Sequence, residues 1–293
     1  MSGKLTEKAA FVLFKLTLFA KRNYLLNEFL TISGLAPLLA RFRDYSTRGI
    51  REKYFEADLY GTKIKIIDGT DRHEYYEEAL RGGIYEPALA GMLKKLLSAG
   101  GPVTFVDIGA HIGYFTVYAG RLIGKRGNVI SIEPNPDYYG QVVRNIEING
   151  LGENVRTFKI GLSDRSGRAE TTGWEERDLV ESETGSVEVA TFDRLCAAEG
   201  IRPDVVKIDV HGAEYKVLSG MTRALDEHVK HLFLETHPED LMQGYKISDV
   251  VNLLDRAKFD LFQLNDFRTN AGGGIAPLGG DLRPDMMIYA RRK

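Results

Sequence analysis

The chain has 293 residues, of which 43% are hydrophobic and 27% charged, and its formal net charge is −2. This length allows a large buried core, and the composition is ordinary for a soluble globular protein. The near-zero net charge offers no basic surface for nucleic acid. The single cysteine, Cys196, excludes an internal disulfide and fits a reducing cytosol, so we expect a cytoplasmic protein.

Residues 1–50 differ in character from the rest of the chain. Their longest uncharged run is shorter than the about 20 apolar residues that a membrane-spanning helix needs. One interpretation is a helical extension that packs on the domain or on a second subunit, as in a homodimer. The other is a helix that lies on a membrane surface, with the arginines at 41, 43, 48 and 51 near lipid head groups.

The next part of the chain is expected to begin with a small β-hairpin. Apolar and polar residues alternate over 54–67, and Gly61 stands near the turn. A loop at 81–87 then leads to a helix at 87–98, which begins with proline. We therefore divide the chain into an N-terminal helical extension, a hairpin and linker region, and one larger domain, at 1–50, 51–80 and 81–293.

The stretch that follows this helix carries the clearest motif of the chain. Residues 103–106 are apolar and rich in β-branched side chains, which predicts a buried strand of a parallel sheet. Asp107 is expected to end that strand. Gly109 and Gly113 then frame a tight turn, where a missing Cβ lets the backbone bend sharply and a ligand come close.

The turn is followed by a helix and a second strand. Apolar residues recur at helical spacing over 114–122, and a further buried-type strand at 129–132 ends in Glu133. Strand, glycine turn, helix, strand and acidic residue are together the opening unit of a nucleotide-binding α/β fold.

The rest of the chain repeats strand and helix units. Further strands are predicted at 155–160, 205–209, 231–235, 259–265 and 286–290. Helices are predicted at 137–149, 191–198, from 214 to 225, and at 250–257. A polar stretch at 165–190, which contains Trp174, is interpreted as a β excursion, and the loop at 271–280 joins the last two strands without a helix, so that they run antiparallel. The fold class is therefore α/β, a doubly wound, Rossmann-like, mostly parallel sheet of seven strands with an antiparallel last strand.

The glycine turn also indicates which ligand it suits. A dinucleotide site spaces its glycines as G-x-G-x-x-G, whereas here the pattern is D-x-G-A-x-x-G. A carboxylate at position 107 would repel a pyrophosphate but would attract a cation. S-adenosylmethionine has an ammonium and a sulfonium and no phosphate, and Glu133 could accept hydrogen bonds from both ribose hydroxyls. A dinucleotide fold with a degenerate fingerprint is the alternative.

Several motifs in one order resemble the FkbM family of S-adenosylmethionine-dependent methyltransferases. They are R-G-G-I-Y-E-P (81–87), D-I-G-A-H-I-G-Y-F (107–115), I-E-P-N (132–135), G-L-S-D (161–164), K-I-D-V-H-G-A-E (207–214) and L-E-T-H-P (234–238). The resemblance implies a class I methyltransferase sheet in the domain at 81–293, and O-methylation of a sugar, glycolipid or other small acceptor. Two positions depart from the family's usual letters: His111 stands where asparagine is common, and His211 where glutamate is common.

The cofactor site is expected beyond the carboxyl ends of the strands. Asp107, Gly109 and Gly113 are predicted to hold the methionine part, Glu133 the ribose, and Ser163 with Asp164 the adenine. The full set assigned to the cofactor is Glu86, Asp107, Gly109, Ala110, His111, Gly113, Tyr114, Phe115, Glu133, Pro134, Asn135, Ser163, Asp164 and Asp209. Acidic residues are expected to converge there from the ends of five strands, namely Asp107, Glu133, Asp164, Asp209 and Glu235.

Methyl transfer to a hydroxyl requires a group that orients the acceptor and takes its proton. His237 is the first candidate, because the pKa of a histidine lies near neutrality. Asp209 is the second, and His211 and Glu235 complete the catalytic set. A structural role for each histidine stays open. By ligand type these four residues could also hold a metal ion, although no metal ligand is assigned.

Other functions remain open at this point. A methyltransferase of the same fold could act on a protein or another macromolecule. A nicotinamide-dependent oxidoreductase is disfavoured by the missing third glycine and by the acid at 107. A module that binds the cofactor without catalysis is the third alternative.

Overall fold

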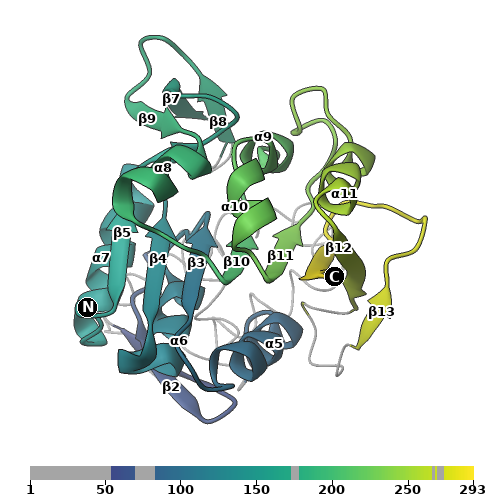
Figure 1. Cartoon of the computed structure of the whole chain (residues 1–293). Helices are drawn as coiled ribbons and strands as arrows, with labels where there is room; N and C mark the ends of the chain where they lie inside the picture. Colours follow the sequence, from purple (N-terminus) through teal and green to yellow (C-terminus); the bar gives the residue numbers. More distant parts are fainter. Residues whose placement is uncertain (1–53, 70–82, 173–177, 266–267, 269–273) are drawn as a thin grey trace, which may run out of the picture. The chain divides into compact units, whose positions relative to one another are not determined.

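The computed structural model describes residues 54–69, 83–172, 178–265, 268 and 274–293 (Figure 1). Within them, the main sheet has eight strands in the order β13-β12-β14-β11-β10-β3-β4-β5. The strands are β3 (Thr104–Ile108), β4 (Asn128–Ile132), β5 (Val155–Phe158), β10 (Val205–Ile208), β11 (His231–Glu235), β12 (Phe259–Leu264), β13 (Ile275–Pro277) and β14 (Met287–Arg292). All seven predicted strands are therefore confirmed, and β13 is an additional one.

The directions of the strands are also those predicted. The run from β5 to β11 is parallel throughout, and β14 lies antiparallel between β11 and β12. The short edge strand β13 pairs antiparallel with β12. It was missed because it has three residues and lies in a loop predicted from its glycines.

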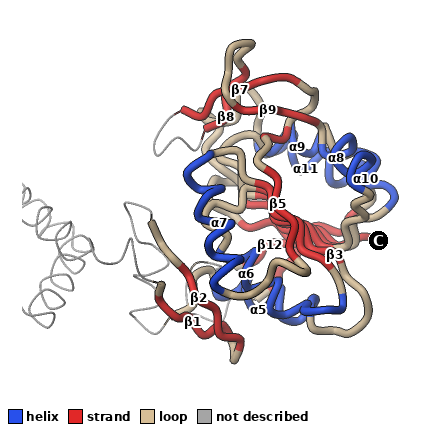
Figure 2. The backbone as a smooth tube through the Cα atoms, turned by 90° about the vertical axis from the view of Figure 1, so that its left-hand side faces the viewer, coloured by secondary structure: helices blue, strands red, loops and turns tan. Residues whose placement is uncertain are grey.

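Helices cover both faces of this sheet (Figure 2). One core contains side chains of α5 (Pro87–Leu97), α6 (Tyr114–Ile123) and α7 (Pro136–Ile148), and the other contains side chains of α8 (Phe192–Glu199), α9 (Glu214–Ser219), α10 (Thr222–Glu227) and α11 (Ile247–Arg256). Successive strand residues alternate between the two cores: Phe105 packs in the first and Val106 in the second. This alternation confirms the doubly wound arrangement.

The main sheet and its helices belong to one compact unit, which comprises Phe55–Ile66 and Arg72–Lys293. Two further β structures belong to the same unit. The predicted hairpin is confirmed as β1 (Phe55–Leu59) and β2 (Thr62–Ile66), which pair antiparallel. Its turn residues Tyr60 and Gly61 have φ of 53° and 86°, as a two-residue hairpin turn requires.

The β excursion is confirmed as a separate four-stranded sheet in the order β6-β9-β7-β8. Its strands are β6 (Gly161–Leu162), β7 (Gly167–Thr172), β8 (Asp178–Glu181) and β9 (Val187–Ala190). Figure 1 shows this sheet beyond the carboxyl ends of the main strands. Trp174 lies outside the described residues.

The single helix predicted up to residue 225 is wrong, because it is two helices. They break at Gly220, where a Cβ would lie 2.1 Å from the carbonyl oxygen of Ser163. The carboxylate of Asp193 accepts hydrogen bonds from the N–H groups of Arg223 and Ala224, each at 2.8 Å, and so caps the second helix.

The predictions for residues 1–50 lie outside the described residues. Among the helices that are described, none is both long enough and apolar enough to cross a membrane.

Candidate active site

Polar side chains gather at the carboxyl ends of four adjacent strands. Glu133 follows β4, Asp209 follows β10, and Glu235 is the last residue of β11. Asp107 lies one residue inside β3 rather than ending it, and pairs in register with Lys207 of β10. The predicted convergence of these four acids is confirmed, since neighbouring parallel strands end at the same edge of the sheet.

The same prediction is wrong for Asp164. The third strand stops at Phe158, and Asp164 instead follows β6 of the small sheet, where it is exposed. Its carboxylate accepts a hydrogen bond from the hydroxyl of Ser163 at 3.1 Å. The adenine role assigned to both residues stays a prediction.

The glycine turn is held between the two neighbouring strand ends. Gly109 has φ of 76°, and a Cβ there would lie 1.8 Å from the carbonyl oxygen of Asp209. The N–H groups of Gly109 and Ala110 both donate to the carbonyl oxygen of Ile132, at 3.0 and 3.1 Å. Glycine at 109 is thus required for the turn to lie against the β10 loop, a packing role that sequence reasoning missed.

Glu133 is positioned by backbone groups on both sides. Its carboxylate accepts hydrogen bonds from the N–H of His111 at 2.7 Å and from the N–H of Asn135 at 2.9 Å, one to each oxygen. Each oxygen of a carboxylate can accept a second bond. Burial raises the pKa of Glu133 to about 7, although these two hydrogen bonds oppose the change.

A buried lysine lies among the acids. The Lys207 ammonium is 3.3 Å from Asp209 Oδ2 and 3.6 Å from Asp107 Oδ1. Burial would lower the pKa of Lys207, but Asp209 and Asp107 raise it above its usual value. Burial raises the pKa of Asp107, against the opposing charge of Lys207 and the hydrogen bond that the Thr116 hydroxyl donates to Asp107 at 2.7 Å. The edge is therefore a mixed cluster of charges rather than a purely negative one.

Two further buried acids at this edge are Glu86 and Glu235. Glu86 is the residue before α5 and has φ of 46°, but its side chain makes no capping hydrogen bond. Its Oε2 has no hydrogen-bond partner among the described residues. Burial and the charge of Glu235 raise the pKa of Glu86 well above its usual value. Glu235 pairs with Arg268, yet burial and the charge of Asp209 raise its pKa to about 7.

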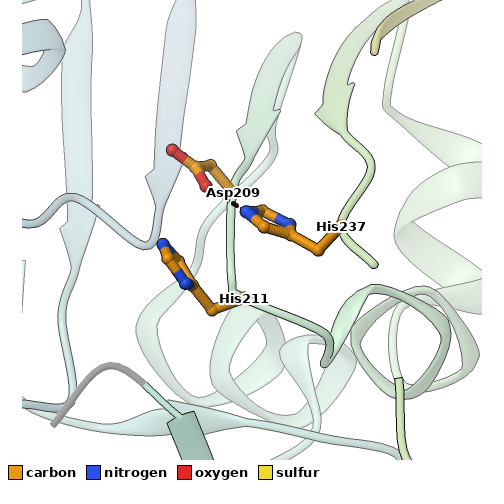
Figure 3. Close-up of side chains that lie close together, drawn as sticks. All are labelled: Asp209, His211 and His237. Carbon is orange, nitrogen blue, oxygen red and sulfur yellow. Dashed lines mark ion pairs between the residues drawn. The ribbon is translucent and has the colours of Figure 1, made fainter. Parts of the chain in front are cut away.

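His237 and Asp209 face each other across the ends of β10 and β11 (Figure 3). His237 Nε2 lies 3.6 Å from Asp209 Oδ1, and His237 Nδ1 is hydrogen-bonded to Glu214 Oε1 at 2.6 Å. Burial would lower the pKa of His237, but the bond to Glu214 and the charge of Asp209 raise it to about 9. The expectation of a near-neutral pKa for His237 is therefore wrong.

His211 completes this group. The centroid of its ring lies 4.5 Å from that of His237, and Asp209, His211 and His237 each offer a ligand atom within 4.8 Å of the others. Burial would raise the pKa of Asp209, but Lys207, His237 and His211 outweigh it and hold that pKa below its usual value. Glu235 does not belong to this group, since its carboxylate pairs with Arg268.

The remaining residues assigned to the cofactor lie in the glycine turn, at the start of α6 or just before α7. Asn135 caps α7, because its side chain accepts from the N–H groups of Asp137 and Tyr138. Tyr114 and Phe115 are buried in the first turn of α6, and the Lys207 ammonium lies 5.7 Å from the centroid of the Phe115 ring. Ala110 and Gly113 belong to the turn itself, and Pro134 follows Glu133 directly.

Sequence reasoning missed Lys207 and Glu214. Lys207 interrupts the apolar strand V-V-K-I-D two residues before Asp209, and residues two apart in a strand share a face, so this signal was present. Glu214 was quoted in a motif but received no role. Its partner His237 lies 23 residues further along the chain, and only the fold brings the two together.

An α/β sheet with a glycine turn, an acid after the next strand and a charged group at the carboxyl edge is typical of proteins that bind a nucleoside cofactor. The sequence profile described as the methyltransferase FkbM domain matches residues 107–261, which is more than half of the chain. The chain belongs to this family of methyltransferases.

Two relatives match about half of the chain. The hexuronic acid methyltransferase AglP of Haloferax volcanii is 32% identical over 161 residues, which cover 52% of this chain and 61% of that protein. The methyltransferase sdnD of Sordaria araneosa is 27% identical over 169 residues, covering 45% of this chain and 65% of that protein. The chain thus spans less than two thirds of the length of either relative.

Among solved structures, the methyltransferase FkbM of Methylobacillus flagellatus KT is similar with a TM-score of 0.45 and 18% identity, over 64% of this chain and 43% of that one.

Proposed function

We propose that the chain uses S-adenosylmethionine to methylate a hydroxyl of a sugar or another small acceptor. The observation that carries the proposal is how the Glu133 carboxylate is hydrogen-bonded. Backbone N–H groups occupy one position on each of its oxygens, and one position on each remains for the two hydroxyls of a ribose. No phosphate is needed for this interaction.

The other side chains at this edge fit the same cofactor. Glu86 Oε2 and Asp107 Oδ1 are buried oxygens without hydrogen-bond partners among the described residues. The Lys207 ammonium lies 3.6 Å from Asp107 Oδ1, which is longer than a hydrogen bond. Leaving a buried oxygen without a hydrogen bond costs about 1–3 kcal/mol, which a cationic donor group would offset. When bound, S-adenosylmethionine supplies a methyl group on a positively charged sulfur. The carbon–sulfur bond breaks, and its electron pair stays on the sulfur.

The acceptor is placed by Asp209 and His237. Because the pKa of His237 lies at about 9, this side chain is protonated near neutral pH and donates rather than accepts. Asp209 is ionised and accepts the hydrogen bond of the acceptor hydroxyl. The relative AglP acts, by its name, on a hexuronic acid, and this supports a sugar as the acceptor class.

A binding experiment tests the cofactor assignment directly. Calorimetry with S-adenosylhomocysteine should show one site per chain, and a thermal-shift panel should show stabilisation by S-adenosylhomocysteine but not by NAD. Glu133→Ala should weaken binding by more than about tenfold, since two ribose hydroxyls lose their acceptor. Stabilisation by NAD alone, or unchanged affinity in Glu133→Ala, would refute the assignment.

A further inference from the structure

We propose that Asp209, His211 and His237 bind a divalent first-row transition-metal ion, and that Glu214 positions His237 as its ligand. The three side chains come from the ends of two adjacent strands, β10 and β11, and point toward one another (Figure 3). Their ligand atoms all lie within 4.8 Å of one another.

The spacing suits an ion of this kind. Bonds of about 2.1 Å to nitrogen and oxygen place neighbouring ligand atoms about 3–3.5 Å apart. His237 Nε2 and Asp209 Oδ1, at 3.6 Å, already have nearly this separation. Asp209 and His211 are only partly buried, so a small rotation of their side chains closes the remaining distance.

An independent observation is the support behind His237. Its Nδ1 is hydrogen-bonded to Glu214 Oε1 at 2.6 Å, and the same oxygen accepts the N–H of Gly212 at 3.0 Å. The Glu214 side chain is 1% exposed, so this carboxylate cannot turn away. A histidine that binds a metal through one nitrogen commonly donates the other N–H to a carboxylate. Here that arrangement leaves Nε2 facing Asp209.

The backbone conformation at His211 also directs its side chain toward His237. His211 has φ of 48°, a left-handed conformation that costs a residue other than glycine about 1 kcal/mol or more. The next residue, Gly212, has φ of 98°, and a Cβ there would lie 2.3 Å from the carbonyl oxygen of Leu241. This turn brings the His211 ring to 4.5 Å from the His237 ring.

The ligand chemistry selects the class of ion. Two imidazoles and one carboxylate favour Mn²⁺, Fe²⁺, Co²⁺ or Zn²⁺ over Mg²⁺ and Ca²⁺, which prefer oxygen. Three protein ligands also leave coordination positions open for a substrate.

The role of the ion rests on the proposed function. With the ion bound, Nε2 of His237 would be a ligand and would carry no proton. The bound cation would hold the acceptor hydroxyl and lower its pKa, so that the hydroxyl loses its proton more readily. The hydroxyl proton passes to solvent water and the acceptor oxygen bonds the methyl carbon, while the electron pair of the broken carbon–sulfur bond stays on sulfur.

Metal binding can be measured on the chain alone. Tag-free protein is stripped with EDTA, dialysed and titrated with Mn²⁺ by calorimetry and with Co²⁺ by its visible absorption. We expect one equivalent per chain. His211→Gln and His237→Gln should each weaken the affinity by more than about tenfold, and Glu214→Gln by about tenfold. His228→Ala, at a partly exposed histidine beside Glu227, is the matched control and should bind as the wild type does.

His211→Gln carries the test if the buried His237 variant does not fold, as judged by circular dichroism. The absence of stoichiometric binding by the wild type, or an affinity unchanged in His211→Gln, would overturn the site. Turnover that survives EDTA would overturn the role in the reaction.

Titration of the same samples with S-adenosylhomocysteine separates this inference from the proposed function. Cofactor binding by a chain that binds no metal would overturn the metal site and keep the function. Metal binding by a chain that binds no cofactor would support the metal site and refute the function.

Discussion

Acidic residues have different partners at the two ends of the parallel strands of the main sheet, here called the amino edge and the carboxyl edge. At the amino edge, Asp204 accepts hydrogen bonds from the N–H of Thr104 at 2.9 Å and from the Lys230 ammonium at 2.7 Å. At the carboxyl edge, one oxygen each of Glu86, Asp107 and Glu214 is buried without a hydrogen-bond partner in the described part of the chain. Both oxygens of Asp204 thus have hydrogen-bond partners in the protein, whereas each of these three carboxylates leaves one oxygen without a hydrogen bond from the described residues.

This contrast separates charges that the protein itself pairs from charges that a ligand can pair. An exposed, fully bonded pair such as Asp204 and Lys230 contributes little to the free energy of unfolding. A buried oxygen without a partner destabilises the protein until a ligand supplies one. Substitutions of charged residues at the carboxyl edge should therefore change catalysis and ligand binding, whereas those at the amino edge should change neither.

The largest effect is expected at His237, which faces Asp209. His237→Ala should lower turnover by about 10²- to 10⁴-fold, because the acceptor hydroxyl loses a positioned group. The affinity for S-adenosylhomocysteine should stay within about twofold, since no contact assigned to the cofactor is removed. Turnover is measured as S-adenosylhomocysteine release with an acceptor that the wild type methylates.

His228→Ala at the amino edge serves as the control and should leave turnover unchanged. Wild-type turnover in His237→Ala would remove His237 from the reaction.

The next largest effect concerns Gly109, which separates the two strand ends. Gly109→Ala should lower the free energy of unfolding by about 3 kcal/mol, because its φ is 76° and the new Cβ would meet the Asp209 carbonyl oxygen at 1.8 Å. Urea denaturation measures this change. Gly100→Ala is the matched control, since Gly100 has φ of 88° but nothing lies within 4 Å of a Cβ there.

Gly100→Ala should therefore cost only the backbone strain, about 1 kcal/mol. An equal decrease in the free energy of unfolding in the two variants would show that the contact with the Asp209 carbonyl oxygen does not affect stability.

Much of this edge could be predicted from the sequence. Apolar runs locate the strands of the main sheet, and adjacent parallel strands bring Asp107, Glu133, Asp209 and Glu235 to one edge whatever their side chains do. The prediction that Asp164 lies at this edge failed because the strand predicted at 155–160 stops at Phe158, and the chain then enters a second sheet. A pattern of apolar residues does not show that exchange of partner strands.

The electrostatics of the site could not be predicted in the same way. The pKa of His237 depends on Glu214, which reaches it from the start of α9. The charge of the acids depends on Lys207, whose neighbours lie on other strands as well as its own. Such partners are defined by distances between elements, and these exist only in the folded chain.

A smaller effect is expected in the pH dependence of cofactor affinity. The pKa of Glu133 is raised to about 7 in the free protein, and two hydrogen bonds from ribose hydroxyls favour its ionised form. Binding must then release a proton at pH values below 7. The affinity for S-adenosylhomocysteine should therefore fall as the pH drops from 7.5 to 5.5, approaching about tenfold per pH unit at the low end.

Calorimetry at several pH values in buffers of different ionisation enthalpy measures both the affinity and the proton release. Glu133→Gln should bind more weakly and lose the dependence in this range. An unchanged slope in Glu133→Gln would assign the titration to another group.

The smallest effect is expected at the amino edge. Asp204→Asn keeps a side-chain oxygen for the Thr104 N–H but removes the ion pair with Lys230, whose side chain is 64% exposed. The free energy of unfolding should fall by less than about 1 kcal/mol, and the affinity for S-adenosylhomocysteine should not change. Asp107→Asn makes the same change at the carboxyl edge, and replaces a carboxylate that lies 3.6 Å from the buried Lys207 ammonium. Because that group belongs to the ligand edge, Asp107→Asn should weaken S-adenosylhomocysteine binding where Asp204→Asn does not, and equal affinities in the two variants would contradict the division between the edges.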